Sequence, residues 1–214
     1  MSGRFIVLDG ADGCGKSTQA RLLADMLVDR GLSVLLTREP GATSVGRQIR
    51  RMLLDPATGD LHPMAEAMLF CADRVQHVCE VLRPALERGQ VVVCDRYASS
   101  TAVYQGYAAG LGWSTMHQLN DMATGGLQPD LLIVLDTPGP HAARTQQYAS
   151  PDPNGRGGPD RIEQNAETYH RRVRLGFIQY ARMMGDRAVV VDGTHSIEQV
   201  HAEILTHVER VLQR

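Results

Sequence analysis

The stretch GADGCGKST, residues 10–18, decides the fold of this chain. It satisfies the pattern G-x-x-x-x-G-K-[ST] through Gly10, Gly15, Lys16 and Ser17. The apolar run RFIVLDG leads into it and a helical pattern beginning KSTQARLL follows, which is the context that this pattern requires. Glycines let backbone N–H groups converge on phosphate oxygens, and the start of a helix adds partial positive charge. The stretch therefore predicts a cradle for the phosphates of a nucleoside triphosphate.

Each residue of this cradle is expected to lie against the phosphates of the nucleoside triphosphate. Lys16 should reach the β- and γ-phosphates, and Ser17 should ligate Mg²⁺. Asp95 follows the apolar run QVVVC, like the acidic residue of a Walker B motif, and is expected to orient Mg²⁺ through water, or the acceptor phosphate. GTPases, ATPases and small-molecule kinases all share the cradle pattern. The predicted ATP-binding residues are Gly10, Ala11, Asp12, Gly13, Cys14, Gly15, Lys16, Ser17 and Thr18.

Strand-like and helix-like runs alternate along the rest of the chain, which indicates a parallel sheet buried on both faces. The predicted fold class is α/β, a P-loop NTPase fold with a five-stranded parallel sheet, helices on both faces and a mobile lid. Residues 1–214 are expected to form one domain, with the lid insert at about 145–160, where Pro, Gly and Asn predict a mobile loop. Strands are predicted at 4–10, 32–40, 90–97, 130–138 and 187–193, and helices at 16–31, 44–54, 64–88, 99–107, 114–124, 166–184 and 196–212.

Composition argues against several other classes of protein. The net charge of −2 offers no general electrostatic basis for binding nucleic acid. Apolar runs such as LLIVL are much shorter than the ~20 residues that cross a bilayer. The N-terminus does not have the form of a signal peptide, so the cytoplasm is the expected location. The cysteines show no C-x-x-C pairing, which favours free thiols over zinc ligation; they are Cys14, Cys71, Cys79 and Cys94.

Four further stretches narrow the activity: TREPGAT at 37–43, FCADR at 70–74, DRYASSTAVYQG at 95–106 and DRIEQ at 160–164. Together with the cradle they resemble the thymidylate kinase family, and the resemblance covers nearly the whole chain. It implies that ATP phosphorylates dTMP to dTDP for dTTP biosynthesis, with Mg²⁺. Two alternatives stand beside it. One is a kinase of another pyrimidine deoxynucleoside monophosphate, such as dUMP, and the other is a P-loop regulator that binds nucleotide without turnover.

The acceptor monophosphate needs cations placed opposite the triphosphate, and the planar fork of arginine suits phosphate oxygens. Arg38, Arg74 and Arg96 lie in the family stretches, and similar enzymes use the matching arginines to hold the dTMP phosphate or to bridge it toward ATP. Phe70 lies four residues before Arg74, so both project from one side of a helix. Phe70 is expected to stack on thymine; the alternatives are a core phenylalanine and, for each arginine, a solvated surface charge.

The resemblance also assigns residues around the base and the sugar. Ser100, Thr101 and Gln105 would carry hydrogen-bonding groups near the base, and Tyr104 resembles the tyrosine that favours deoxyribose. Asp12 resembles the acidic residue that similar enzymes aim at the acceptor sugar hydroxyl. We expect Glu39 to help place the sugar or the metal. Helix capping is the alternative for Ser100 and Thr101, and capping or loop bonding is the alternative for Asp12, Glu39 and Asp95.

Some thymidylate kinases carry a catalytic arginine in the glycine loop, but positions 11–14 here read Ala, Asp, Gly and Cys. Bacterial-type members instead bring an arginine from a mobile lid. Arg156, flanked by two glycines, is the expected catalytic cation, with Arg144 and Arg161 as alternatives. Asp160 and Glu163 would anchor the lid or the acceptor side. The predicted catalytic residues are Lys16, Arg96, Arg156, Asp95 and Asp12.

Two further expectations follow from the resemblance. The family usually reads REPGGT where this chain has Ala42, so the local turn would differ if that position required a positive φ angle. Members of the family form dimers through helices packed side by side, so a homodimer is expected. The predicted helices at 64–88 and 99–124 are apolar enough to permit it.

Overall fold

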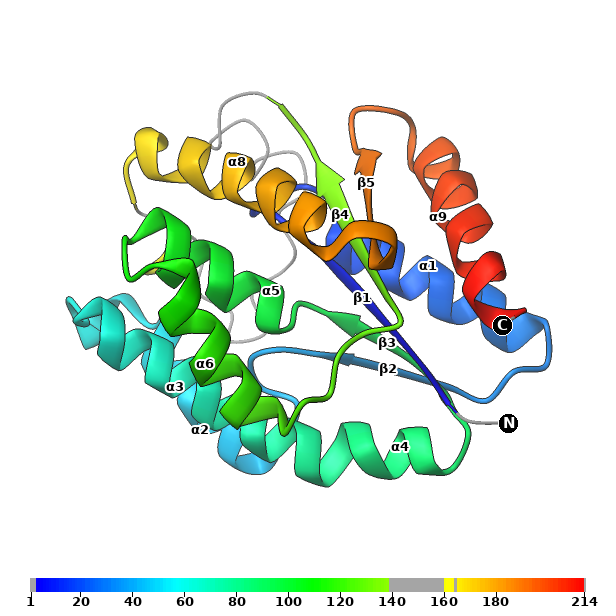
Figure 1. Ribbon diagram of the computed structural model, residues 1–214, viewed down its shortest axis with the longest axis horizontal. Coiled ribbons are helices and arrows are strands. Elements are labelled where there is room, and N and C mark those ends of the chain that lie inside the picture. Colours follow the sequence, from blue (N-terminus) through cyan, green and yellow to red (C-terminus); the bar gives the residue numbers. More distant parts are fainter. Residues whose placement is uncertain (1–2, 139–159, 164, 214) are drawn as a thin grey trace.

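The computed structural model describes residues 3–138, 160–163 and 165–213. Five strands form one parallel sheet in the order β2-β3-β1-β4-β5 (Figure 1). The central strands are buried along almost their whole length, as expected for continuous apolar runs covered on both faces. The predicted α/β fold with a five-stranded parallel sheet is confirmed. The strands are β1 (Arg4–Gly10), β2 (Val34–Arg38), β3 (Val91–Asp95), β4 (Leu131–Asp136) and β5 (Ala188–Asp192).

The helices follow the predicted order, with two differences. The helix predicted at 64–88 contains a π-helical turn, η2 (Val78–Leu82). The helix predicted at 99–107 continues into a second π-helical segment, η3 (Ala102–Ala108). Each π-helical turn shifts the faces that the following residues present. The α-helices are α1 (Lys16–Asp29), α2 (Ser44–Leu54), α3 (Pro63–His77), α4 (Arg83–Glu87), α5 (Ala98–Thr101), α6 (Trp113–Thr124), α8 (Glu167–Met184) and α9 (Ile197–Leu212).

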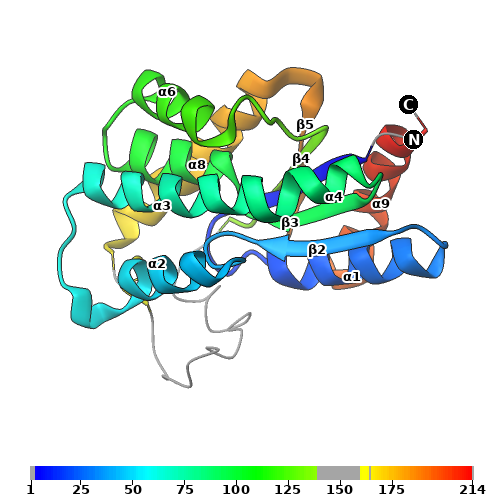
Figure 2. The same ribbon diagram turned by 90° about the horizontal axis from the view of Figure 1, so that it is seen from below.

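The helices cover both faces of the sheet (Figure 2). On one face α1 and α9 pack side by side, and Leu23 and Ile204 lie in the same apolar cluster as Ile6 of β1. On the other face α4, α5 and α8 contact the sheet, and Phe177 and Val103 lie with Val7 in a second cluster. No helix in the described part of the chain is long and apolar enough to span a membrane.

The carboxyl end of the sheet brings distant parts of the chain together. In the register of β1 and β3, Leu8 lies opposite Asp95, so the end of β3 lies beside the start of the glycine loop. Gly10 has a φ of +143°, and a Cβ there would lie 2.5 Å from the carbonyl oxygen of Leu135. Only glycine tolerates both the φ angle and the approach of β4. The glycine loop and Asp95 thus lie together at the carboxyl ends of β1 and β3. Ligands of open α/β sheets bind at this edge.

Candidate active site

The glycine loop ends in Gly15, which caps α1 with a φ of +92°. Lys16, the first residue of α1, folds back over this loop and is only 6% exposed. Its ammonium Nζ donates to the carbonyl oxygen of Ala11 at 2.8 Å and to Sγ of Cys14 at 3.6 Å. The cation therefore sits among the loop's backbone groups at the start of a helix, an arrangement that suits a chain of phosphates.

Ser17 and Asp95 form a pair beside this loop. The Ser17 hydroxyl donates to Oδ2 of Asp95, which joins the start of α1 to the end of β3. The other carboxylate oxygen, Oδ1, is buried and accepts no hydrogen bond from the described residues. A buried carboxylate oxygen without a donor suits a cation, and Mg²⁺ prefers few protein oxygens together with phosphates and water. The two side chains therefore fit the Mg²⁺ that the glycine loop implies.

Arg96 joins the glycine loop to the start of α5. It has a φ of +72° and is the one non-glycine residue with positive φ in the described ranges. Its guanidinium donates to Asp12, to the carbonyl oxygen of Gly10 at 3.4 Å and to Oγ of Ser100 at 3.2 Å. Burial lowers the pKa of Arg96, but the phenol of Tyr104 and then the carboxylates around it outweigh that effect and hold it above its ordinary value. The side chain is a fixed cation at the centre of the site.

Asp9 was not predicted as a site residue, yet it organises this cluster from inside. It is fully buried and accepts from the backbone N–H of Gly10 at 2.9 Å, from Ser99 at 2.6 Å and from Ser100 at 2.8 Å. Its Oδ1 lies 3.6 Å from Nη1 of Arg96. Burial raises the pKa of Asp9, and Arg96 opposes this rise. The sequence signal that could have identified Asp9 was its position as an acidic residue near the end of an otherwise apolar strand.

Tyr104 and Asp12 lie together beside Arg96 at the glycine loop. The Tyr104 hydroxyl donates to Oδ2 of Asp12 at 2.7 Å, and the Arg96 guanidinium lies 5.4 Å from the Tyr104 ring centroid. The structure therefore brings together three predicted site residues, and Ser100 joins them through Arg96. Ser100 bonds to Asp9 rather than capping α5, which has no side-chain cap.

Arg74 and Glu39 are placed inside the protein and bond to each other. Arg74 is 1% exposed, and its Nε donates to Oε2 of Glu39 at 2.9 Å. Its remaining donors reach Thr101 at 3.0 Å, Asn120 at 2.8 Å and the carbonyl oxygen of Tyr97 at 3.0 Å. Oε1 of Glu39 lies 2.9 Å from a ring nitrogen of the buried His77. This network ties α3 to α5 and to the loop after β2; direct contact of Arg74 and Glu39 with a ligand stays a prediction.

Asp73 supports the same loop from α3. Its Oδ1 accepts from the backbone N–H of Gly41 at 3.0 Å, while Oδ2 is buried and accepts from no described residue. Burial, and then the nearby Glu39 carboxylate, raises the pKa of Asp73 to about 6. The bend of the loop lies at Gly41, which has a φ of +110°, and Ala42 does not have a positive φ. The departure from REPGGT therefore needs no altered turn.

Asp73→Asn should change how stability depends on pH. Because the folded-state pKa of about 6 exceeds the ordinary 3.8, the folded protein keeps a proton that the unfolded chain releases. The free energy of unfolding therefore falls as pH rises across this interval, by about 3 kcal/mol from this one group. Asn does not titrate, so the variant should gain up to this amount relative to wild type between pH 4 and pH 7 in urea unfolding. The exposed Asp29→Asn is the control, and identical pH slopes for Asp73→Asn and wild type would contradict the shift.

Arg38 ends β2 at the open edge of the site and is exposed. Near it lies Arg50 of α2, which sequence reasoning missed and which donates to the carbonyl oxygen of Pro40 at 3.0 Å. Burial, and then the positive charge of Arg38, lowers the pKa of Arg50. Two cations that repel each other beside Arg96 favour an anion between them. No pattern in the sequence marked Arg50, because its position depends on how α2 packs.

Phe70 is half-buried on α3 and packs against the main apolar cluster. One turn earlier on the same helix, Glu66 accepts from Nε2 of Gln105 at 2.6 Å. Glu66 also pairs with Arg161, whose Nε donates to the carbonyl oxygen of Leu53 at 2.8 Å. The structure thus brings Phe70 and Gln105 to one region, and it binds Arg161 to α2 and α3 rather than to the phosphate loop. Arg144 and Arg156 lie outside the described residues.

Asp160 and Glu163 turn the chain where the described residues resume. Oδ1 of Asp160 accepts from the backbone N–H groups of Ile162 and Glu163, at 2.9 Å each. Oε2 of Glu163 in turn accepts from the backbone N–H of Asp160 at 3.1 Å. This turn holds Arg161 against α2 and α3; a role of Asp160 and Glu163 in anchoring the lid or the acceptor side stays a prediction.

A hollow lies beside the glycine loop. Cys14, Gly15 and Thr18 line it from the loop and α1, and Gly193 and Ile197 line it from the connection between β5 and α9. Burial raises the pKa of the Cys14 thiol, so Cys14 presents a neutral apolar wall. The hollow suits the nucleoside end of the triphosphate, and the contribution of the segment after β5 was not predicted.

Known proteins resemble this chain along nearly its whole length. A family model described as Thymidylate kinase matches residues 8–204. The thymidylate kinase of Symbiobacterium thermophilum is 46% identical over 213 residues, covering 98% of this chain and 94% of that protein. That of Pelotomaculum thermopropionicum is 43% identical over 212 residues, covering 99% and 95%. The crystal structure of thymidylate kinase from Ehrlichia chaffeensis has a TM-score of 0.76 at 27% identity, covering 97% of this chain and 100% of that one. Since the family model matches residues 8–204 and two of these relatives are 43% and 46% identical over nearly the whole chain, the chain belongs to the thymidylate kinase family.

Proposed function

We propose that this thymidylate kinase phosphorylates dTMP to dTDP by holding the two nucleotides end to end across the carboxyl end of the sheet. The observation that carries this proposal is that two cations bind one glycine loop, Lys16 through Ala11 and Arg96 through Gly10 and Asp12. Phosphoryl transfer needs alignment and compensation of charge rather than covalent catalysis, and the two cations supply both.

On the donor side, Lys16 and the backbone N–H groups of the loop hold the triphosphate of ATP. The hollow between Gly15 and Gly193 takes the adenosine. Ser17 and Asp95 would hold Mg²⁺, which neutralises charge on the phosphates when bound. Asp95 keeps a buried oxygen that accepts no hydrogen bond from the described residues, so the described part of the chain would provide one hydroxyl and one carboxylate and leave the other positions to phosphates and water.

On the acceptor side, Arg38 and Arg96 hold the monophosphate of dTMP, and Arg50 adds a third cation. Phe70 stacks on thymine, while Tyr104 and Asp12 face the sugar. Asp9 fixes Arg96 from within, so the guanidinium is in place before the substrate arrives. A site that needs no rearrangement of its charges lowers the barrier more than one that must assemble during the reaction.

The catalytic arginine is proposed to be Arg156 of a lid, as in bacterial-type members of the family. This proposal is supported by the contacts of Arg161, one of the two alternative arginines. Arg161 is bound to Leu53 and Glu66 rather than to the phosphate loop. The cytoplasm is the proposed location. Free thiols suit a reducing compartment, and the four cysteines are free: Cys14, Cys71, Cys79 and Cys94.

Steady-state release of ADP from ATP and Mg²⁺ tests the proposal directly. The rate should depend on dTMP and should be lower with dUMP, dCMP or dGMP at equal concentration. ADP release that ignores dTMP would reject the kinase reaction and favour a nucleotide-binding regulator. A preference for dUMP would favour the alternative pyrimidine monophosphate.

Phe70→Ala should raise the KM for dTMP much more than the KM for ATP. The half-buried ring offers one face to a base, and the loss of base stacking on an aromatic ring costs about 1–3 kcal/mol, or roughly 5- to 150-fold in affinity. Phe70→Leu keeps the apolar volume and is the matched control for packing. Equal weakening of dTMP and ATP, or full activity of Phe70→Ala, would argue that Phe70 is only a core residue.

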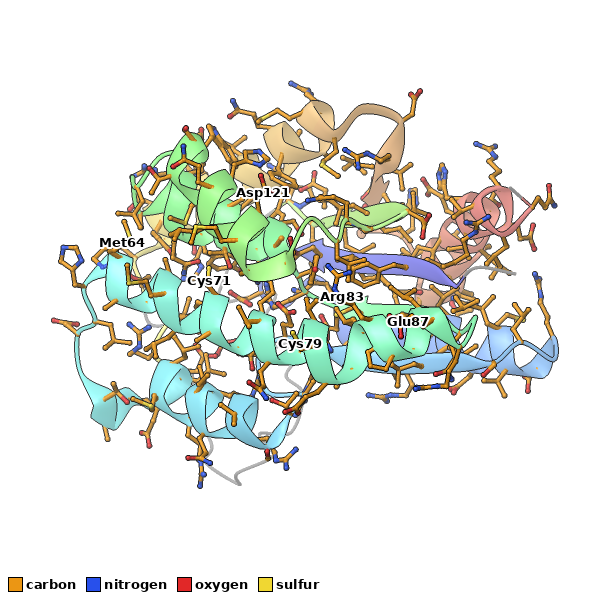
Figure 3. All side chains as sticks on the ribbon, turned by 60° about the horizontal axis from the view of Figure 1, so that its bottom comes forward. Met64, Cys71, Cys79, Arg83, Glu87 and Asp121 are labelled. Carbon is orange, nitrogen blue, oxygen red and sulfur yellow. The ribbon has the colours of Figure 1, made fainter. Side chains whose placement is uncertain are left out.

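The homodimer is proposed to form through the outer face of α3, η2 and α6, which faces the viewer in Figure 3. Large apolar side chains on this face are exposed, with Met68 at 54%, Val75 at 43% and Met122 at 79%. Val75→Glu should shift sedimentation from dimer to monomer at micromolar concentration because it buries a charge in an apolar interface. Met183→Glu on α8, also exposed, is the control. An unchanged sedimentation coefficient for Val75→Glu would place the interface elsewhere.

A further inference from the structure

Two side-chain bridges connect α3 to the segment formed by α5 and η3. Glu66, Phe70 and Arg74 are four residues apart in succession, so they lie along one face of α3. Arg74 donates to Thr101 at 3.0 Å, and Gln105, four residues after Thr101, donates to Glu66 at 2.6 Å. Phe70 lies between the two bridges. One edge of a base stacked on the Phe70 ring would therefore face the bridge between Glu66 and Gln105.

The bridge to Glu66 decides which amide atom Gln105 has left for a ligand. A carboxylate is an acceptor only, so it must take an N–H of the Gln105 amide. This turns Nε2 toward α3 and leaves the carbonyl oxygen Oε1, which accepts no hydrogen bond from the residues that the structure describes. Gln105 is 1% exposed, and buried amides keep the orientation that their fixed partners impose.

Arg161 fixes Glu66 in turn. Its Nη2 pairs with Oε2 of Glu66, and its Nε and backbone N–H donate to the last carbonyl oxygens of α2, on Leu53 at 2.8 Å and Leu54 at 3.2 Å. The guanidinium supplies the opposite charge that a mostly buried carboxylate requires. Because Arg161 occupies Oε2, Glu66 has Oε1 available for Gln105.

We propose that Glu66, held by Arg161, is a positioning residue that sets base specificity by turning the Gln105 carbonyl toward the acceptor base. Thymine and uracil carry an N3–H that donates to this oxygen, whereas cytosine presents an acceptor at N3 and is repelled. The inference rests on the proposed stacking of the acceptor base on Phe70. It assigns the choice between N3–H bases and cytosine to a residue that does not itself touch the nucleotide.

Glu66→Gln tests this orientation at nearly constant shape. Arg161 needs an acceptor, so the new amide turns its oxygen to Arg161 and its NH₂ to Gln105. The Gln105 amide then rotates and presents NH₂ to the base. We expect the ratio of kcat/KM for dTMP over dCMP to fall by about 10-fold or more, since a site built for one hydrogen-bond pattern discriminates strongly against the reverse. The dTMP to dUMP ratio and the KM for ATP should not change.

Two variants separate orientation from a loss of structure. Glu66→Asp keeps an acceptor-only group, so it should retain the dTMP to dCMP ratio even if both KM values rise. Glu87→Gln, an exposed change on α4, which lies outside the proposed dimer face, should retain all parameters. Should Glu66→Gln not fold, Arg161→Met frees Glu66 from α2 and should raise the KM for dTMP and dUMP without raising that for dCMP.

A folded Glu66→Gln enzyme with an unchanged dTMP to dCMP ratio would overturn the inference. The same fall in Glu66→Asp would also overturn it, because an acceptor would then not be the deciding property. Absence of dTMP turnover in the wild-type enzyme would instead reject the proposed function itself. The two failures are therefore distinguishable in one set of assays.

Discussion

Lys16→Ala should lower kcat for dTMP phosphorylation by about 10²- to 10³-fold or more, the loss found when a fixed charge or donor is removed from a transferring group. The ammonium of Lys16 is held within the glycine loop by the Ala11 carbonyl and the Cys14 thiol. Neither partner is an ion, so the variant leaves no buried charge unpaired. The protein should stay folded, and the melting temperature measures this directly.

Lys16 is also the one lysine among the 22 lysine and arginine residues of the chain, which gives an independent test. ATP with Mg²⁺ should protect its amine from an acylating reagent, while the N-terminal amine reacts as before. Lys16→Arg keeps the charge but replaces a compact ammonium with a planar fork, and it should recover little activity. Wild-type kcat in Lys16→Ala, or acylation of Lys16 at an unchanged rate with ATP bound, would contradict the proposed contact.

Arg96→Lys should lower kcat/KM for dTMP by about 10²- to 10³-fold, because a single ammonium does not span the contacts that the guanidinium makes. Arg96 reaches Gly10, Ser100 and Asp12, and it lies 3.6 Å from the fully buried Asp9. Arg96→Ala should in addition reduce the free energy of unfolding by about 3–5 kcal/mol, since it leaves the Asp9 charge without its cation.

Arg30→Lys is the matched control for Arg96→Lys, because Arg30 pairs with Glu209 at the surface. An exposed pair contributes about 0–1 kcal/mol, so this variant should keep both activity and stability. Urea unfolding and steady-state kinetics of the three variants separate the catalytic effect from the structural one. An Arg96→Lys enzyme with near-wild-type kcat/KM would show that Arg96 only supports the loop and does not contact the acceptor phosphate.

The parts of the site that are contiguous in the chain were predictable. From β1 through the glycine loop to Lys16, the strand, the phosphate cradle and the helix follow one another directly along the chain. Their arrangement therefore depends on local conformation alone. Asp95 and Arg38 were also within reach, since parallel strands end at the same edge of a sheet. The family resemblance assigned Phe70 and the stretch around Tyr104 to the acceptor nucleotide, and these roles stay predictions.

The partners of these residues were not predictable in the same way. Arg74 belongs to a family stretch, yet packing placed its guanidinium between Glu39, Thr101 and Asn120, inside the protein. The side-chain type was consistent with a surface charge, a phosphate ligand or a buried bridge. Which of these occurs depends on how closely α3 approaches α5, and that distance is set by the whole core.

By itself, the sequence determined the parallel sheet and the phosphate loop, because hydrophobic periodicity, apolar runs and glycine spacing act over a few neighbouring positions. Only the tertiary structure decided that Asp9 anchors Arg96, that Arg96 meets Asp12 across 84 positions of the chain, and that Glu66 faces Gln105. The physical reason is that a buried charge takes the nearest opposite charge or hydrogen-bonding partner in space, and spatial proximity arises from packing rather than from order along the chain.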